Sequence, residues 1–264
     1  MTRIVEIIDR SVQGATRPFI CRGDDGEIYF VKGRHAGFRS LCCEWVAGEL
    51  ARRWQLPVAP FAIVEVPAAL VRGSTRDDAQ ELGAGMAFGS RQVEGAVELQ
   101  WSLAEGNEIS WKLRARILLF DWWVANPDRT LSESGGNPNL LWTESDRQLH
   151  LIDHNLAFSK HMMPRLLHDY AENHFYGGHA LLDEILFPTM TPDLVSPTLQ
   201  ATFDLANFWE TEREHFGEIW RALPEEWTDA APDFTEQCVR QLLDLAQRET
   251  ITAFWGLEPA PEGE

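Results

Sequence analysis

The hydrophobic pattern of the chain changes near residues 90–100, and this change constrains the fold more than any other feature. Before it, the runs Ile28–Val31 and Phe61–Val66 are typical of β-strands. Between these runs, SLCCEWVAGELARRWQL suits an amphipathic helix that Ser40 could cap. After the change helical patterns dominate, beginning with the strongly apolar run Leu113–Val124. The sequence therefore predicts an α+β protein with a strand-rich first part and a mainly helical second part.

The charge balance of the chain limits its partners. The net charge is −18, from 41 acidic and 23 basic residues. Because nucleic-acid binding depends on clustered Lys and Arg, this balance argues against direct binding to nucleic acid or to an anionic membrane. The chain has no apolar run of about 18 residues and no apolar stretch of a secretion signal at its N-terminus. We therefore expect a cytoplasmic protein, with its four cysteines reduced and no membrane partner.

A polar stretch, FDWWVANPDRTLSESGGNPNLLW (Phe120–Trp142), separates two apolar segments of the second part. It contains Asp128, and Asn139 precedes the β-like run LLW, while Asp153 closes the next β-like run, LHLI. If these runs pair as a hairpin, Asn139 and Asp153 lie at one end of it and face Asp128. Each residue alone could be a turn or capping residue. Together they offer the carboxylate and amide oxygens that Mg²⁺ prefers.

Lysine is scarce in this chain, and Lys32 ends a strand with apolar neighbours. An unpaired ammonium there would be costly, so an anionic partner is expected, and Glu44 on the following helix is the natural choice. The alternative is a lysine that extends its ammonium to solvent at a strand end.

The segments YFVKG, CEWVAGELA, NPDR, NPNLLW and LIDHNLAF together resemble the HipA-like branch of the protein-kinase-like superfamily, over about residues 11–160. The last segment is also similar to an element of type II phosphatidylinositol 4-kinases. The resemblance implies a bilobal protein-kinase-like fold. Its N-lobe would comprise residues 1–93 and its C-lobe residues 94–256, followed by an acidic tail at 257–264.

The same resemblance implies ATP and Mg²⁺ as cofactors and assigns roles to the polar residues. Lys32 would contact the α and β phosphates and pair with Glu44. Asp128 would orient or deprotonate the acceptor hydroxyl, and Asn139 and Asp153 would hold Mg²⁺. 

Two further segments have positions that match nucleotide-binding parts of the family. The loop Ser11–Phe19, with Gly14 and Thr16, would cover the phosphates, and either Ser11 or Thr16 could be phosphorylated. The connection between the lobes would bind adenine through the backbone groups of Gln92, Val93 and Glu94.

The chain also departs from the kinase pattern. Asn139 lies eleven positions after Asp128, where typical kinases have about five, so Asn137 becomes a rival metal ligand. His154 and Asn155 replace the last two residues of the DFG motif, and DRT stands where relatives often have DRH. These changes put regulation in doubt more than metal binding.

The later histidines, together with the paired tryptophans, have less specific interpretations. His161, His168, His174 and His179 lack the spacing of a metal site and are expected in a helix or loop of the C-lobe. Trp122 and Trp123 are expected in the core.

The interpretation that accommodates most of these residues is an ATP- and Mg²⁺-dependent phosphotransferase, specifically a serine/threonine protein kinase resembling the HipA toxins. Its acceptor would be a protein of unknown identity, and an antitoxin-like protein would be a partner. Two alternatives stay open: a small-molecule or lipid kinase on the same fold, and a nucleotide-binding pseudokinase that acts as an interaction module.

Overall fold

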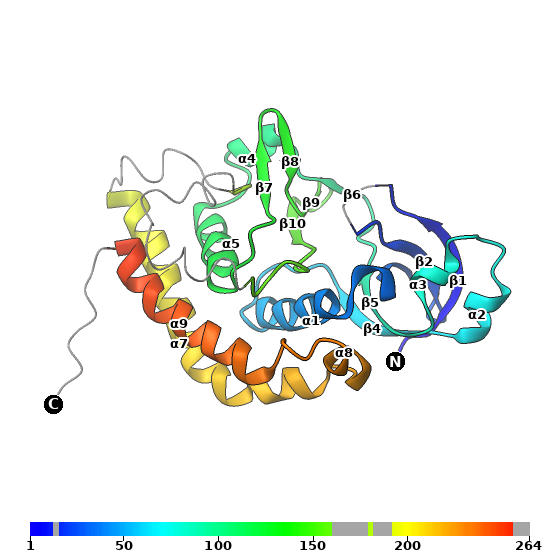
Figure 1. Cartoon of the computed structure of the whole chain (residues 1–264). Coiled ribbons are helices and arrows are strands. Elements are labelled where there is room, and N and C mark those ends of the chain that lie inside the picture. The colour runs from blue at the N-terminus through cyan, green and yellow to red at the C-terminus, as the bar shows by residue number, and fades with distance from the viewer. Residues whose placement is uncertain (13–15, 160–178, 182–191, 256–264) are drawn as a thin grey trace.

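The computed structural model describes residues 1–12, 16–159, 179–181 and 192–255. Figure 1 shows a strand-rich N-terminal part that α1 joins to a C-terminal part with long helices. The predicted mixture of a strand-rich front and a helical back is confirmed, although the short strands β6 to β10 also lie at or after the change in pattern. The expected acidic tail, residues 257–264, lies outside the described residues.

The N-terminal part is a five-stranded antiparallel sheet with the order β1-β2-β3-β5-β4. Its strands are β1 (Ile4–Arg10), β2 (Phe19–Gly23), β3 (Ile28–Lys32), β4 (Phe61–Val66) and β5 (Gly85–Arg91). Both predicted strands are present, as β3 and β4. Along β3, Tyr29 and Val31 are buried while Ile28 and Phe30 are half-buried, as expected when alternate side chains face the core.

Helix α1 (Phe38–Arg53) connects this sheet to the rest of the molecule. It begins before Ser40, and Gly37 occupies the N-cap without a side-chain hydrogen bond, so the predicted capping role of Ser40 is wrong. The helix approaches the sheet closely at Gly48, where a Cβ atom would lie 2.8 Å from Cζ of Phe61. Only glycine permits this contact without displacing the aromatic ring.

Two small sheets are present among the described residues of the second part. One has the order β10-β9-β6, built from β6 (Ala96–Glu98), β9 (Leu140–Thr143) and β10 (Gln148–Leu151). The pairing of β9 with β10 confirms the predicted hairpin. The other is a hairpin that the sequence did not predict, made of β7 (Thr130–Ser132) and β8 (Gly135–Asn137). It is formed by the residues that lengthen the segment between Asp128 and Asn139 (Figure 1).

Helices make up most of the described remainder. The long ones are α5 (Trp111–Trp123), α7 (Pro192–Arg221) and α9 (Glu236–Trp255). The shorter ones are η1 (Arg34–Ala36), α2 (Ala68–Gly73), α3 (Ala79–Leu82), α4 (Trp101–Glu105) and α8 (Glu225–Asp229). Helix α5 matches the predicted apolar helix, and the Ser110 hydroxyl caps it by accepting a hydrogen bond from the Leu113 N–H at 3.4 Å.

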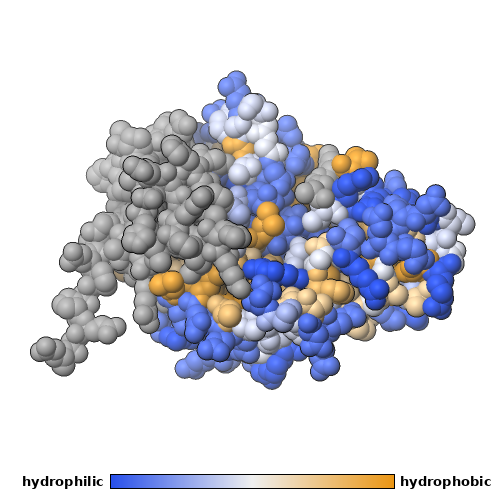
Figure 2. Space-filling model, viewed as in Figure 1, coloured by the Kyte–Doolittle hydropathy of each residue, from blue (hydrophilic) through white to orange (hydrophobic). Residues whose placement is uncertain are grey.

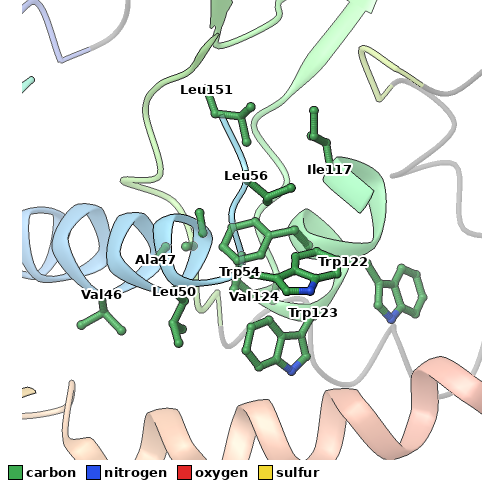
Figure 3. Packing of buried hydrophobic residues seen from close by; sticks show 14 of the residues in the cluster. Val46, Ala47, Leu50, Trp54, Leu56, Ile117, Trp122, Trp123, Val124 and Leu151 are labelled. Atoms are coloured by element: carbon green, nitrogen blue, oxygen red, sulfur yellow. The ribbon is translucent and has the colours of Figure 1, made fainter. Parts of the chain in front are cut away.

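The main hydrophobic core joins α1, α5 and the C-terminal helices. Figure 3 shows side chains of α1 and α5 gathered around Trp54, Trp122 and Trp123, with Leu151 nearby. The rings of Trp123 and Trp209 lie 5.3 Å apart, and the Trp123 indole N–H donates to the Leu243 carbonyl at 3.1 Å. Truncating such a buried tryptophan typically costs about 3–5 kcal/mol. This core therefore fixes α1, and with it the polar groups that α1 carries, against the helical part.

The described part of one face of the molecule is mainly polar (Figure 2). Figure 2 shows hydrophilic residues over most of the described face, with small apolar patches between them. None of the helices within the described ranges has the length and apolar character needed to cross a membrane.

Candidate functional site

Lys32 lies at the end of β3 and is buried between two carboxylates. Its Nζ is 2.5 Å from Oε1 of Glu44 on α1 and 2.8 Å from Oδ2 of Asp153, which follows β10. The expected ion pair between Lys32 and Glu44 is present, and Asp153, predicted as a metal ligand, shares the same ammonium. Three residues predicted from separate motifs thus meet at one point.

Burial and charge oppose each other in this cluster. Burial disfavours the Lys32 ammonium, but the Glu44 and Asp153 carboxylates outweigh it and raise the pKa of Lys32. Burial raises the pKa of Glu44 to about 7, despite the attraction of Lys32. Burial also opposes ionisation of Asp153, yet Lys32 holds the pKa of Asp153 below its usual value. One ammonium therefore faces two carboxylates, and the cluster favours a further cation beside Asp153.

Helix α1 holds Glu44 in place through contacts with distant parts of the chain. The Trp45 indole N–H donates to the Ile219 carbonyl at 3.1 Å, and the Arg39 guanidinium donates to the Phe158 carbonyl at 3.0 Å. The second carboxylate oxygen of Glu44 accepts the backbone N–H of His154 at 2.8 Å. These bonds tie the helix to α7 and to the segment that follows Asp153.

Asp128 is the acceptor for two asparagine side chains. The Nδ2 groups of Asn137 and Asn139 each donate to Oδ2 of Asp128 at 3.0 Å. Asn139 also donates to the Asp128 carbonyl oxygen at 3.2 Å. Burial raises the pKa of Asp128, although both amides favour its ionised form. The structure therefore brings together all three residues of the predicted polar loop, with one carboxylate oxygen, Oδ1, outside these bonds.

The β9–β10 hairpin places Asn139 and Asp153 at the same end, as predicted. Leu140 pairs with Leu151, and the Ile152 N–H donates to the Asn139 carbonyl at 3.1 Å. Asn139 and Asp153 both have positive φ, 48° and 57°. Residues other than glycine adopt this conformation at an energetic cost, and such positions are concentrated at functional sites.

A cavity of about 570 Å³ lies between β3, β5 and the β9–β10 hairpin. Lys32, Glu44, Asn139 and Asp153 line its polar end. Its apolar walls include Phe30, Phe88, Leu141 and Ile152. A space that is apolar on one side and charged on the other fits a ligand with an aromatic base and a phosphate chain.

The residues expected to bind adenine and phosphate are only partly placed around this cavity. Gln92, Val93 and Thr16 line it, whereas Glu94 does not, and Gly14 lies outside the described residues. The Gln92 N–H donates to the Ile28 carbonyl at 2.8 Å and is thus already engaged within the sheet.

A second cavity of about 820 Å³ adjoins the first, and Asp128 lines it. Thr16, Asn137 and Asp153 line both cavities, so the two spaces meet beside the carboxylates. A ligand in the first cavity and another in the second would approach each other next to Asp128 and Asp153.

The metal-ligand chemistry depends on oxygen donors from two residues. Among the described residues, no group of three or more His, Cys, Asp or Glu side chains is arranged to hold a metal ion. An amide oxygen from Asn139 and a carboxylate from Asp153 still suit Mg²⁺, which usually takes one or two protein carboxylates and completes its coordination with phosphate and water oxygens.

A buried polar network that was not predicted from the sequence lies behind the site. Asp121 on α5 is buried and accepts hydrogen bonds from Arg129 and His179. A lone carboxylate within the apolar run ILLFDWWVA was a usable signal, because a buried charge requires partners. His161, His168 and His174 lie outside the described residues.

His154, which replaces the middle residue of the DFG motif, is buried against the ring of Phe120 at 6.1 Å between centroids. Burial, helped by the nearby Arg129, lowers the pKa of His154 to about 3, so the ring is neutral at physiological pH. The ring of His154 lies in the core, and its neighbour Asp153 lines both cavities.

A comparison with known protein families matches most of the chain. A family model described as HipA-like kinase matches residues 4–257. No curated protein matches the chain. Among solved structures, the chain is similar to the crystal structure of a Helicobacter pylori proinflammatory kinase, CtkA, at 12% identity and a TM-score of 0.48. That match covers 96% of this chain and 93% of the other.

Proposed function

Because the chain belongs to the HipA-like kinase family, we propose that it is an ATP- and Mg²⁺-dependent kinase that phosphorylates a serine or threonine hydroxyl of another protein. The observation that carries the proposal is the meeting of Lys32, Glu44, Asp128, Asn139 and Asp153 where two cavities join. Phosphoryl transfer requires a cation on the phosphates, oxygen ligands for Mg²⁺ and a carboxylate beside the acceptor.

The proposal includes a bilobal kinase fold, with an N-lobe at residues 1–93 and a C-lobe at 94–256. It is supported by the position of the first cavity, whose lining residues come from β3 and β5 on one side and from β9 and the end of β10 on the other. ATP would occupy this cavity, with adenine between the apolar walls and near Gln92 and Val93.

Lys32 would bind the α and β phosphates while Glu44 keeps its ammonium in position. Asn139 and Asp153 would hold Mg²⁺, which when bound neutralises charge on the phosphate oxygens. Asn139 is preferred over Asn137 because it directly precedes β9, and its carbonyl accepts the Ile152 N–H beside Asp153. In this assignment Asn137 serves Asp128 instead of the metal.

Asp128 would act on the acceptor in the second cavity. Its Oδ2 is held by two amides, so Oδ1 is the oxygen that can accept the proton of the attacking hydroxyl. A pKa raised by burial makes this carboxylate a stronger base than an exposed aspartate.

A protein acceptor is favoured over a lipid because the chain has a net charge of −18, which opposes approach to an anionic membrane. An antitoxin-like protein partner is part of the same proposal and rests on the resemblance of the sequence to the HipA toxins. A metabolite acceptor and a pseudokinase are the outcomes that the experiment must separate.

The test incubates the purified chain with γ-labelled ATP and Mg²⁺, alone, with a proteome and with a metabolite pool. Label and mass increments on serine or threonine are the expected result. Asp153→Ala should abolish transfer, whereas Asp146→Ala, in the exposed turn between β9 and β10, should retain it.

Three results would count against the proposal. Unchanged transfer by Asp153→Ala would refute the site. Label confined to metabolites would identify a small-molecule kinase. Thermal stabilisation by ATP and Mg²⁺ without transfer to any acceptor would identify a nucleotide-binding module.

A further inference from the structure

Arg129, the residue after Asp128, is completely buried, and its N–H groups are all engaged. A guanidinium has five N–H donors, and five contacts are present. Nε and one Nη2 hydrogen serve Asp121, at 2.6 and 3.4 Å, and the other Nη2 hydrogen faces Nε2 of His154 at 3.4 Å. The two Nη1 hydrogens go to backbone carbonyls. A side chain with this many partners has one orientation.

The carbonyls that accept from Nη1 belong to the two strand ends of the candidate metal site. One is the carbonyl of Asn139, and the other, at 3.3 Å, is the carbonyl of Ile152, which precedes Asp153. Asn139 and Asp153 are also the two residues there with positive φ. One guanidinium nitrogen thus bridges the backbone at both residues that would present oxygens to Mg²⁺.

Asp121 holds the guanidinium from behind. Besides Arg129, it accepts from Nε2 of His179 at 3.0 Å and from Nδ2 of Asn126 at 2.9 Å. The His179 ring is itself oriented, because its Nδ1 accepts the Leu181 N–H at 3.1 Å. Burial opposes ionisation of Asp121, but Arg129 and His179 hold the pKa of Asp121 well below its usual value, so the carboxylate stays charged. Asp121 on α5 therefore anchors Arg129 through a buried ion pair.

We propose that Arg129 is a positioning residue that sets the separation of Asn139 and Asp153 and so determines the affinity of the site for Mg²⁺. The inference rests on the proposed function, in which these two residues are the metal ligands. Arg129 touches neither ligand's side chain oxygens and acts through their backbone.

Simple core packing does not require this arrangement. An apolar side chain could fill the space without an ion pair to satisfy, and replacement of buried ion pairs by apolar residues is often stabilising. Lysine would keep the charge but not the fork, because its three donors radiate from one nitrogen. The guanidinium reaches Asp121 with Nε and Nη2 and the two carbonyls with Nη1, which a single ammonium cannot do at once. Arg129→Lys, with its cation paired to Asp121, therefore loses the bridge between the two carbonyls.

Arg114 provides the matched control. It is also a buried arginine, and it donates to the carbonyls of Ile109 and Gly106 at 2.9 and 2.6 Å. It does not line either cavity of the site. Arg114→Lys reproduces the loss of a buried guanidinium bound to backbone carbonyls, away from the metal ligands.

The experiment measures thermal stabilisation of the full chain by a non-hydrolysable ATP analogue during a Mg²⁺ titration, and nucleotide binding in EDTA. Arg129→Lys should raise the Mg²⁺ concentration for half-maximal stabilisation about tenfold or more, as removal of groups that orient metal ligands does elsewhere. Nucleotide binding in EDTA should change little, and Arg114→Lys should match the unaltered chain in both measurements.

A folded Arg129→Lys variant with the unaltered Mg²⁺ requirement overturns the inference. If that variant does not fold, His179→Ala tests the same anchor more gently, since it removes one donor to Asp121, while His179→Gln retains an amide donor. A Mg²⁺ requirement that is equal in the two histidine variants also overturns it. Phosphate transfer by the unaltered chain, measured in parallel, reports on the proposed function separately.

Discussion

Two substitutions of Asp128 should separate its chemical role from its structural role. Asp128→Asn keeps an oxygen that can accept the amides of Asn137 and Asn139, both at 3.0 Å in the native site. Asp128→Ala removes that acceptor. We expect both variants to lose phosphate transfer by about 10²–10⁴-fold, the usual contribution of a positioned acid or base.

The expected stabilities differ because of burial. In Asp128→Ala, the amide of buried Asn139 keeps the Asp128 carbonyl as one acceptor, but its second hydrogen loses the carboxylate, and an unsatisfied buried donor costs about 1–3 kcal/mol. Half-buried Asn137 can turn to water and adds less. In Asp128→Asn, the weaker neutral hydrogen bonds are offset by relief from burying a charge, since burial raises the pKa of Asp128. Its free energy of unfolding should stay within about 1 kcal/mol of the native value.

Chemical denaturation and labelled-phosphate transfer would be measured on both variants, with Asp146→Asn as the exposed control. Transfer by Asp128→Asn within about threefold of the native rate would refute the assigned role, because a lost general base costs far more. Equal destabilisation by both Asp128 variants would refute the hydrogen-bond reasoning.

Three further substitutions test the packing and the pH dependence of the fold. A Cβ atom on Gly33 would overlap the Leu82 carbonyl, so Gly33→Ala should destabilise the chain by about 1–3 kcal/mol in thermal or urea unfolding. Gly73→Ala, in a helix with open space around the new methyl, should stabilise it by about 0.4–1 kcal/mol. His154→Phe should reduce acid sensitivity. The drop in unfolding free energy between pH 7 and pH 5 should be about 2 kcal/mol smaller than in the native chain.

The direction of the pH effect follows from the lowered pKa of His154. Burial moves that pKa from 6.5 to about 3, so between these values the unfolded chain binds the proton and the folded chain does not. The contribution of neutral His154 to the unfolding free energy is therefore fully present above pH 6.5 and is lost as the pH falls towards 3. An unchanged pH dependence in His154→Phe would contradict this account. Equal changes in unfolding free energy in Gly33→Ala and Gly73→Ala would contradict the packing argument at Gly33.

Several structural features could be predicted because they depend on local patterns. The strands β3 and β4 follow from β-branched and aromatic runs, and α5 follows from a long apolar run. The pair of Lys32 and Glu44 follows from the cost of burying an ammonium alone. The hairpin of β9 and β10 follows from two short apolar runs around a polar turn.

Other features were missed because their causes are not local. The β7–β8 hairpin occupies what the sequence presented as an irregular insertion, and it returns Asn137 to Asp128. The cap of α1 is Gly37 instead of Ser40, since the helix starts earlier than its apolar pattern.

The sequence by itself determined which chemical groups the candidate site has, and in what order they occur along the chain. Tertiary structure alone decided that Asp153 shares the ammonium of Lys32 and that Asp121 anchors Arg129 together with His179. The physical reason is distance along the chain. Hydrogen bonds and ion pairs form between groups that folding brings within about 3 Å, and no periodicity or turn signal encodes which distant segments will meet.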